Sequence, residues 1–115
     1  MPQLWHTGSM RREGTGLAPD ARTVSPSGLK YPGKEVGVAL SKQDVIDIAD
    51  AFAKGSVAAR EAGFDGVQFH GAHGYLIDTF FWEGTNVRDD KYGGMLEERT
   101  AFAVEIIEKS RTAVG

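Results

Sequence analysis

The apolar positions of the chain fall into two long helical patterns and two short runs. Apolar residues recur at helical spacing over residues 41–62 and again over 96–113, which predicts two amphipathic helices. The runs 2–6 and 66–69 are too short for a periodicity argument, and we interpret each as a strand. The resulting order of strand, helix, strand, helix is typical of a parallel α/β fold.

Local signals give the first helix its limits. Ser41 and Asp44 have the spacing of a capping box, in which each side chain satisfies a backbone N–H at the helix start. Gly63 follows the last apolar position and is expected to end the helix, because glycine readily takes the left-handed conformation found there. The helix is therefore predicted to begin near Ser41 and to end near Ala62.

The connecting segments differ in what they predict. Residues 7–40 are rich in glycine and proline, with turn signals such as Pro32-Gly33, and are expected to form a long loop without an element of its own. Such a loop is a lid, a binding loop or disordered. Residues 76–82 fit either a short helix or a pocket wall. Residues 86–94 are polar and end in Gly93-Gly94, interpreted as turn glycines with positive φ.

Composition excludes several classes of protein. With 115 residues the chain is at most one domain, and its net charge of −3 without a large basic cluster argues against nucleic acid as a partner. The absence of cysteine excludes disulfides and thiolate chemistry. No apolar run approaches a membrane span and the N-terminus lacks a signal-peptide pattern, so no membrane partner and a cytoplasmic location are expected.

Two strands and two helices do not close a core, because each helix covers only one face of a sheet. The chain begins on a strand and ends on a helix. We therefore expect that it is a piece of a larger α/β protein or that it associates with itself as a homo-oligomer.

The candidate chemistry is concentrated in residues 70–75, where His70, His73 and Tyr75 follow the second strand. In parallel α/β folds, ligands bind at the carboxyl ends of strands. From spacing alone three interpretations stay open. The histidines could be structural and bonded to backbone; they could hold a metal, with His6 or Asp78 as a third ligand; or they could donate to one substrate oxygen while Tyr75 supplies a proton.

Three segments together resemble the Old Yellow Enzyme family of FMN-dependent NADH:flavin oxidoreductases. Residues 63–76 (GFDGVQFHGAHGYL) resemble the fourth-strand segment of that family, residues 86–94 its Asn-x-Arg-x-Asp-x-Tyr-Gly-Gly loop, and residues 3–8 its third-strand segment. The segments occur in the family order, so the resemblance spans residues 1–115. It implies a partial (β/α)8 TIM barrel, made of two consecutive βα units of a parallel barrel, and therefore a partial FMN-dependent oxidoreductase domain.

The resemblance also implies a function and a set of site residues. The family reduces activated alkenes such as α,β-unsaturated carbonyl compounds, with FMN as cofactor and NADH or NADPH as reductant. By matching position, His70 and His73 would hold and polarise the carbonyl oxygen of an enone or enoyl substrate, and Tyr75 would protonate its α-carbon. Gln3 would hydrogen-bond the flavin, and Trp5 would line the substrate pocket.

Two other functions are weighed against this ene-reductase. The chain could be a truncated, non-catalytic piece that self-associates through exposed sheet edges, or a small histidine-based metal-binding protein. For the second we expect no bound zinc, because structural zinc normally takes four ligands and only His70 and His73 are evident.

Overall fold

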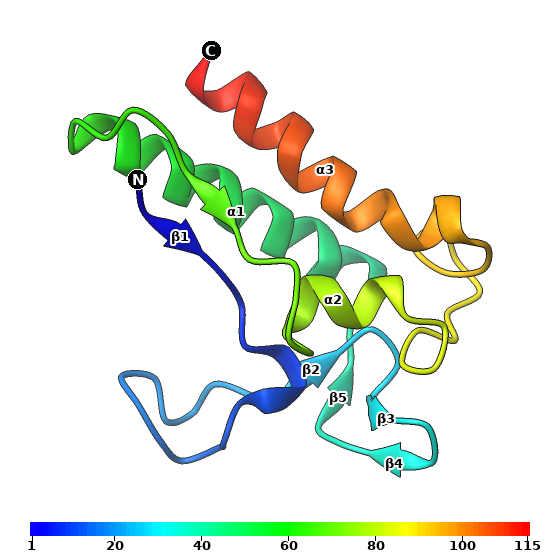
Figure 1. Ribbon diagram of the computed structural model, residues 1–115. Coiled ribbons are helices and arrows are strands. Elements are labelled where there is room, and N and C mark those ends of the chain that lie inside the picture. The colour runs from blue at the N-terminus through cyan, green and yellow to red at the C-terminus, as the bar shows by residue number, and fades with distance from the viewer.

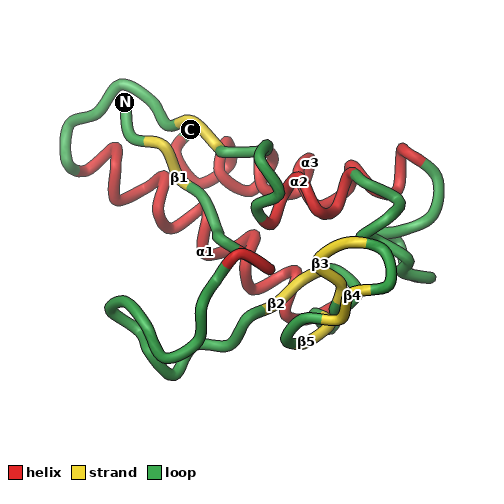
Figure 2. Tube along the Cα trace, turned by 60° about the horizontal axis from the view of Figure 1, so that its bottom comes forward, coloured by secondary structure: helices red, strands yellow, loops and turns green.

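The computed structural model describes residues 1–115 and has two long helices packed on each other, one of which packs against a pair of parallel strands (Figure 1; Figure 2). Strands β1 (Gln3–Leu4) and β6 (Gln68–Phe69) run parallel, with Gln3 opposite Gln68. Helices α1 (Lys42–Glu61) and α3 (Leu96–Val114) lie side by side. The expected α/β class, the parallel pairing and both long helices are confirmed.

The predicted limits of α1 are also confirmed. The Ser41 Oγ accepts from the Asp44 backbone N–H at 3.0 Å, and the Asp44 carboxylate accepts from the Ser41 backbone N–H at 2.8 Å, which completes the capping box. At the other end Gly63 has a φ of +86°, the left-handed conformation that ends a helix. Both limits follow from contacts between residues close in sequence.

The expectation that residues 7–40 contain no element of their own is wrong. A 3-10 turn, η1 (Gly8–Met10), is followed by four short strands: β2 (Val24–Ser25), β3 (Leu29–Tyr31), β4 (Lys34–Glu35) and β5 (Val38–Ala39). β3 and β4 form an antiparallel hairpin, and β2 pairs with β5 in parallel. Strands this short show no periodicity, so the sequence pattern could not predict them. We call residues 24–39 the strand insert.

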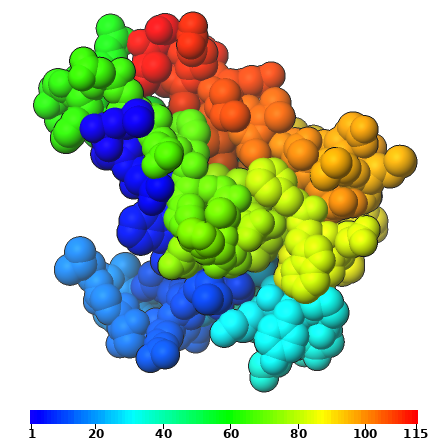
Figure 3. All heavy atoms as spheres, viewed as in Figure 1, coloured from blue at the N-terminus to red at the C-terminus, as the bar shows by residue number.

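The strand insert closes on itself through a close approach of two backbones. Gly37 has a φ of +54°, and a Cβ at that position would lie 2.0 Å from the Thr23 carbonyl oxygen. The Val38 backbone N–H donates to the same oxygen at 3.0 Å. Only glycine fits there. Figure 3 shows the hairpin of the insert, in cyan, against the yellow segment that follows α2, where Pro32 lies beside Gly84.

The open alternative for residues 76–82 is decided in favour of a helix. α2 (Leu76–Phe81) buries Leu76 and Phe80 completely and packs against α3. It belongs to a single apolar core with residues of α1, α3 and the connecting segments. The members of that core are Leu40, Val45, Ala49, Phe52, Leu76, Ile77, Phe80, Tyr92, Phe102 and Ile106.

Polar contacts join the outer parts of the two long helices. The Lys109 ammonium lies 2.5 Å from the Asp50 carboxylate and 3.4 Å from that of Glu105. The Tyr92 hydroxyl donates to Glu105 at 2.7 Å, and burial together with this carboxylate raises the pKa of Tyr92. None of the helices has both the length and the apolar character needed to cross a membrane.

Candidate active site

Backbone hydrogen bonds bring the ends of β1 and β6 to the same place. The His70 N–H donates to the Leu4 carbonyl at 2.9 Å, and the Leu76 N–H donates to the His6 carbonyl at 3.0 Å. The turn between β6 and α2 is therefore attached to the β1 segment on both of its sides. This is the carboxyl end of both parallel strands, where the ligands of α/β proteins bind.

Four ring side chains gather at this edge. The ring centroid of His70 lies 5.2 Å from that of His73 and 5.0 Å from that of Tyr75, and both pairs meet edge to face. The Trp5 indole lies 6.4 Å from His70 and 6.2 Å from Tyr75, and it is 52% exposed. We call Trp5, His70, His73 and Tyr75 the His–Tyr cluster. The groups of the cluster that can donate or accept a proton, His70, His73 and Tyr75, thus lie next to one another.

The turn that presents the cluster has an unusual backbone. His73 has a φ of +61° and is the one non-glycine residue with a positive φ, and Gly74 follows at +76°. The left-handed conformation costs a residue with a Cβ about 1–2 kcal/mol. The Asp78 carboxylate on α2 accepts from the Gly74 N–H at 2.8 Å. This contact attaches the strained turn to a buried helix.

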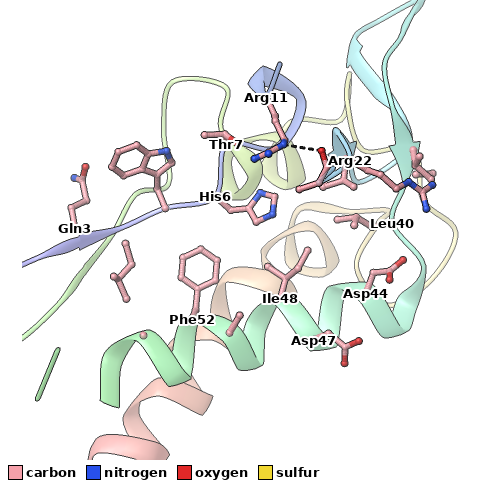
Figure 4. Close-up of a pocket in the computed structure, with 18 residues that line it drawn as sticks. Gln3, His6, Thr7, Arg11, Arg22, Leu40, Asp44, Asp47, Ile48 and Phe52 are labelled. Atoms are coloured by element: carbon pink, nitrogen blue, oxygen red, sulfur yellow. Dashed lines mark hydrogen bonds between the residues drawn. The ribbon is translucent and has the colours of Figure 1, made fainter. Parts of the chain in front are cut away.

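Gln3 lies on the same strand face as Trp5. Side chains alternate along a strand, so Leu4 lies on the face of β1 toward α1, with its Cδ1 3.2 Å from where a Cβ on Gly55 would lie, whereas Gln3 points away from α1 (Figure 4). The Gln3 amide nitrogen donates to the Gln68 amide oxygen at 2.7 Å. The pairing of β1 with β6 thus places Gln3 and Gln68 on the face opposite α1. Gln68 is a contact that the sequence interpretation missed.

His6 has a structural environment that differs from the two clustered histidines. Its Nδ1 accepts from the Gly8 backbone N–H at 3.0 Å, which defines the start of η1. Burial lowers the pKa of His6, and the positive charge of Arg11 lowers it further. A neutral imidazole that accepts this hydrogen bond is therefore the form that the fold favours.

One pocket is lined by Gln3 and by Trp5 of the His–Tyr cluster, but not by the other three members of the cluster. This pocket of about 910 Å³ lies between β1, α1 and the strand insert, and none of His70, His73 and Tyr75 lines it (Figure 4). On α1, Ile48 and Phe52 point toward β1, and Asp44 and Asp47 also line the pocket (Figure 4). β1 has a hydrogen-bonded partner strand on one side only. We therefore interpret this pocket as an uncovered flank of the core.

The loop of residues 86–94 joins distant parts of the chain. The Asn86 amide donates to the Phe80 and Tyr92 carbonyls, each at 2.8 Å. Arg88 binds Asp90 through two hydrogen bonds, and its Nη1 also donates to the carbonyls of Pro26 at 2.7 Å and Leu40 at 2.5 Å. Pro26 and Leu40 directly follow β2 and β5. The link from Arg88 to the strand insert has no signal in the sequence.

The arrangement does not favour the metal interpretation. No three His, Asp or Glu side chains gather in a way that could hold an ion. Asp78, one of the two side chains that could have completed a site with the histidine pair, accepts instead from the Gly74 backbone.

The fold and the site define a parallel α/β protein with a ring-rich, proton-handling cluster at the carboxyl ends of its strands. The NADH:flavin oxidoreductase / NADH oxidase family model matches residues 1–115. The chain belongs to this family, and the resemblance to Old Yellow Enzymes is confirmed.

Individual relatives agree with this assignment. The chain is 42% identical over 99 residues to the probable NADH-dependent flavin oxidoreductase YqiG of Bacillus subtilis, covering 86% of this chain and 27% of that protein. It is 38% identical over 120 residues to 12-oxophytodienoate reductase 1 of Oryza sativa, covering 98% of this chain and 31% of the reductase. The chain thus spans about a third or less of the length of these relatives.

Solved structures give the same result. Morphinone reductase in complex with tetrahydroNAD superposes with a TM-score of 0.86 at 29% identity, over 98% of this chain and 35% of that one. The Old Yellow Enzyme homologue from Zymomonas mobilis superposes with a TM-score of 0.84 at 35% identity, over 98% of this chain and 34% of that one.

Proposed function

We propose that residues 1–115 form the third and fourth βα units of an FMN-dependent (β/α)8 barrel that reduces α,β-unsaturated carbonyl compounds with NADH or NADPH. The observation that supports this most directly is the position of His70, whose ring lies 5.2 Å from His73 and 5.0 Å from Tyr75 at the end of β6. Relatives named as flavin oxidoreductases and 12-oxophytodienoate reductases support the same reaction class.

In this proposal the two histidines bind one oxygen. Each neutral imidazole has one N–H donor, and two such donors aimed at a carbonyl oxygen stabilise the negative charge that develops on it. His70 is half-buried and His73 is exposed, so the pair lies between the protein and an incoming substrate. The expected substrate is therefore a small enone or enoyl compound with its carbonyl oxygen between the two rings.

Tyr75 supplies the proton. Its phenol is the one hydroxyl group of the cluster, and its ring centroid lies 5.0 Å from that of His70. When bound, FMN would supply the hydride for the β-carbon of the alkene, with NADH or NADPH as its source. The Tyr75 O–H bond then breaks as a C–H bond forms at the α-carbon, and water restores the phenol. The alkene gains two electrons and two hydrogens, and NADH becomes NAD⁺.

The face formed by Gln3 and Trp5 fits a planar, polar ring. The Gln3 amide offers both a donor and an acceptor, and its hydrogen bond to Gln68 limits its rotation. Trp5 adds a flat apolar surface that is 52% exposed. We assign Gln3 to hydrogen-bonding the flavin ring and Trp5 to the wall of the substrate pocket. Other contacts to the cofactor would come from the remaining strands of a barrel.

The test places this chain in a complete barrel. We call the test protein the barrel chimera: residues 1–115 of this chain replace the matching segment of the Bacillus subtilis flavin oxidoreductase. We expect the chimera to bind FMN, to lose its flavin absorbance when NADH is added, and to recover it on mixing with 2-cyclohexenone. A chimera that binds FMN and reacts with NADH, yet leaves the enone unchanged, would contradict the proposal. If the full replacement does not bind FMN, a shorter graft of residues 63–94 tests the same cluster.

A further inference from the structure

Asp78 makes a contact that the proposed reaction does not use directly. Its Oδ2 accepts from the Gly74 backbone N–H at 2.8 Å, four residues earlier in the chain. Asp78 lies in the first turn of α2, between Ile77 and Thr79, which are both buried. The carboxylate is therefore held by a helix that is itself fixed in the core.

The turn that Asp78 contacts is attached to the β1 segment at both of its ends, but inside the turn there is a single backbone hydrogen bond. His73 and Gly74 both have positive φ, and the backbone bond within the turn, from the Tyr75 N–H to the Ala72 carbonyl, is long at 3.3 Å. His73 takes up this conformation against the preference of a residue with a Cβ. A side-chain oxygen that accepts from the Gly74 N–H stabilises the conformation, because it gives this backbone donor a partner within the turn.

This turn sets the distances within the His–Tyr cluster. His70 directly follows β6 and precedes the turn, whereas His73 and Tyr75 lie within it and just after it. A rotation of the backbone at His73 or Gly74 would move the His73 ring and the Tyr75 phenol relative to His70. The geometry of the two proposed oxygen donors and the proton donor thus depends on the state of one short turn.

We propose that Asp78 is a positioning residue of the ene-reductase site, which holds the His73–Gly74 turn so that His73 and Tyr75 face His70. The inference rests on the proposed function of these three residues. Asp78 touches neither substrate nor cofactor in this account. Its carboxylate acts through the Gly74 N–H, and an acceptor oxygen matters more than the negative charge.

A purely structural role makes different predictions. An acid in the first turn of α2 also interacts favourably with the helix dipole, and loss of that interaction would lower thermal stability without altering the cluster. Asp78→Asn removes the charge and keeps an acceptor oxygen, whereas Asp78→Ala removes both. The two variants therefore separate the positioning role from the dipole effect.

The experiment compares both variants in the FMN-loaded barrel chimera. We expect Asp78→Ala to slow the enone-dependent recovery of flavin absorbance about 10–100-fold, the usual effect of losing a residue that orients a reacting group. Its reaction with NADH should stay unchanged. Asp78→Asn should restore most of the lost rate. Equal losses in both variants, or equal damage to both half-reactions, would overturn the proposal.

Hydrogen–deuterium exchange provides a readout that does not depend on activity. The peptide spanning residues 70–76 should exchange faster in Asp78→Ala than in Asp78→Asn or the parent chimera, while peptides from α1 and α3 stay unchanged. Unchanged exchange in this peptide would overturn the positioning role even if the rate fell. If the peptide exchanges faster in Asp78→Ala but the parent chimera never reduces the enone, the result would instead count against the proposed function.

A second variant covers the case in which Asp78→Ala does not fold. Asparagine adopts positive φ more readily than histidine, so His73→Asn should stabilise the turn by itself. The double variant His73→Asn/Asp78→Ala should then fold. Adding Asp78→Ala to His73→Asn should increase hydrogen–deuterium exchange less than adding Asp78→Ala to the parent does. Full additivity of the two changes would contradict the coupling that the proposal requires.

Discussion

Arg88 and Asp90 form a bidentate ion pair, with Nε 3.0 Å from Oδ1 and Nη2 2.6 Å from Oδ2. The pair turns the remaining Arg88 nitrogen toward the Pro26 and Leu40 carbonyls. One side chain thus joins the loop of residues 86–94 to both ends of the strand insert. The strand insert and Trp5 line the same pocket. The Arg88 contacts therefore connect the loop of residues 86–94 to the surroundings of the His–Tyr cluster.

Arg88→Ala should destabilise the barrel chimera by about 2–4 kcal/mol, because it leaves Asp90 unpaired and two carbonyls without their donor. The Arg88 side chain is only 8% exposed, so water replaces these contacts poorly. Thermal denaturation measures the loss. The matched control is Arg12→Ala, an exposed arginine whose replacement should change stability by about 0.5 kcal/mol or less. Equal effects of the two variants would contradict the structural role of Arg88.

Asp90 should give the protein part of its acid sensitivity. Its hydrogen bonds from Arg88 hold the pKa of this carboxyl below its usual range. Since the folded-state pKa is lower than the unfolded value of about 3.9, ionised Asp90 stabilises the fold above that pH. The stabilisation is lost as the pH falls through the folded-state pKa.

The melting temperature of the parent chimera should therefore fall more steeply below about pH 4 than that of Asp90→Asn. Asp89→Asn is the control, because Asp89 is exposed and forms no ion pair. Parallel pH profiles for the parent and Asp90→Asn would rule out this contribution.

Gly93 and Gly94 are required for different reasons. The sequence predicts positive φ for both, and this is correct only for Gly94, at +116°. A Cβ on Gly93 would lie 2.4 Å from the Arg88 carbonyl oxygen, whereas one on Gly94 would meet nothing within 4 Å. Glycine is required at position 93 because the backbone of Arg88 lies too close for any Cβ.

Gly93→Ala should therefore destabilise the chimera by about 3 kcal/mol or more, since the rigid backbone must shift. Gly94→Ala should cost about 1 kcal/mol, from its positive φ alone. Thermal denaturation of the two variants side by side gives the comparison. A larger loss in Gly94→Ala would show that backbone conformation outweighs the close approach.

Tyr75→Phe should affect one half-reaction of the barrel chimera. Removing the hydroxyl removes the proton donor to the α-carbon, and general acid catalysis contributes about 10²–10⁴-fold. Stopped-flow measurements should show slow recovery of flavin absorbance with an enone and an unchanged reaction with NADH. Tyr31→Phe, an exposed tyrosine on the strand insert, is the control. A loss of equal size in both half-reactions would argue against the role of Tyr75.

Replacing His70 and His73 together should weaken carbonyl binding. The donors that would bind the oxygen are then absent, so phenols, which bind through their own oxygen, should also bind poorly. Titration of the flavin spectrum with a phenol measures this affinity. Unchanged phenol affinity in the double variant would show that the histidines do not bind the ligand oxygen.

The 115-residue chain by itself should oligomerise or be unstable, bind FMN weakly if at all, and lack enone reductase activity. β1 has a partner strand on one edge only, and Trp5, Phe64 and Ile107 are each 48–57% exposed. Light scattering and an FMN fluorescence titration test this directly. Leu17→Ser, a change outside the strand pair, should leave association unchanged. A stable monomer with tight one-to-one FMN binding would contradict the prediction.

Signals between neighbouring residues determined much of the fold. The Ser41–Asp44 capping box and Gly63 set the limits of α1, because each acts through hydrogen bonds or φ preferences within a few residues. Periodicity located α3 for the same reason. The grouping of His70, His73 and Tyr75 was also visible, since six consecutive residues that follow a strand share one end of it.

The tertiary structure alone decided the contacts between distant segments. The pairing of Val24 with Val38, the approach of Trp5 to His70, and the reach of Arg88 to Leu40 all depend on how the elements pack. Strands of two residues and single side-chain bridges leave no periodic trace in a sequence. Their energy comes from surfaces that meet only once the core has formed, and for that reason the sequence by itself did not reveal them.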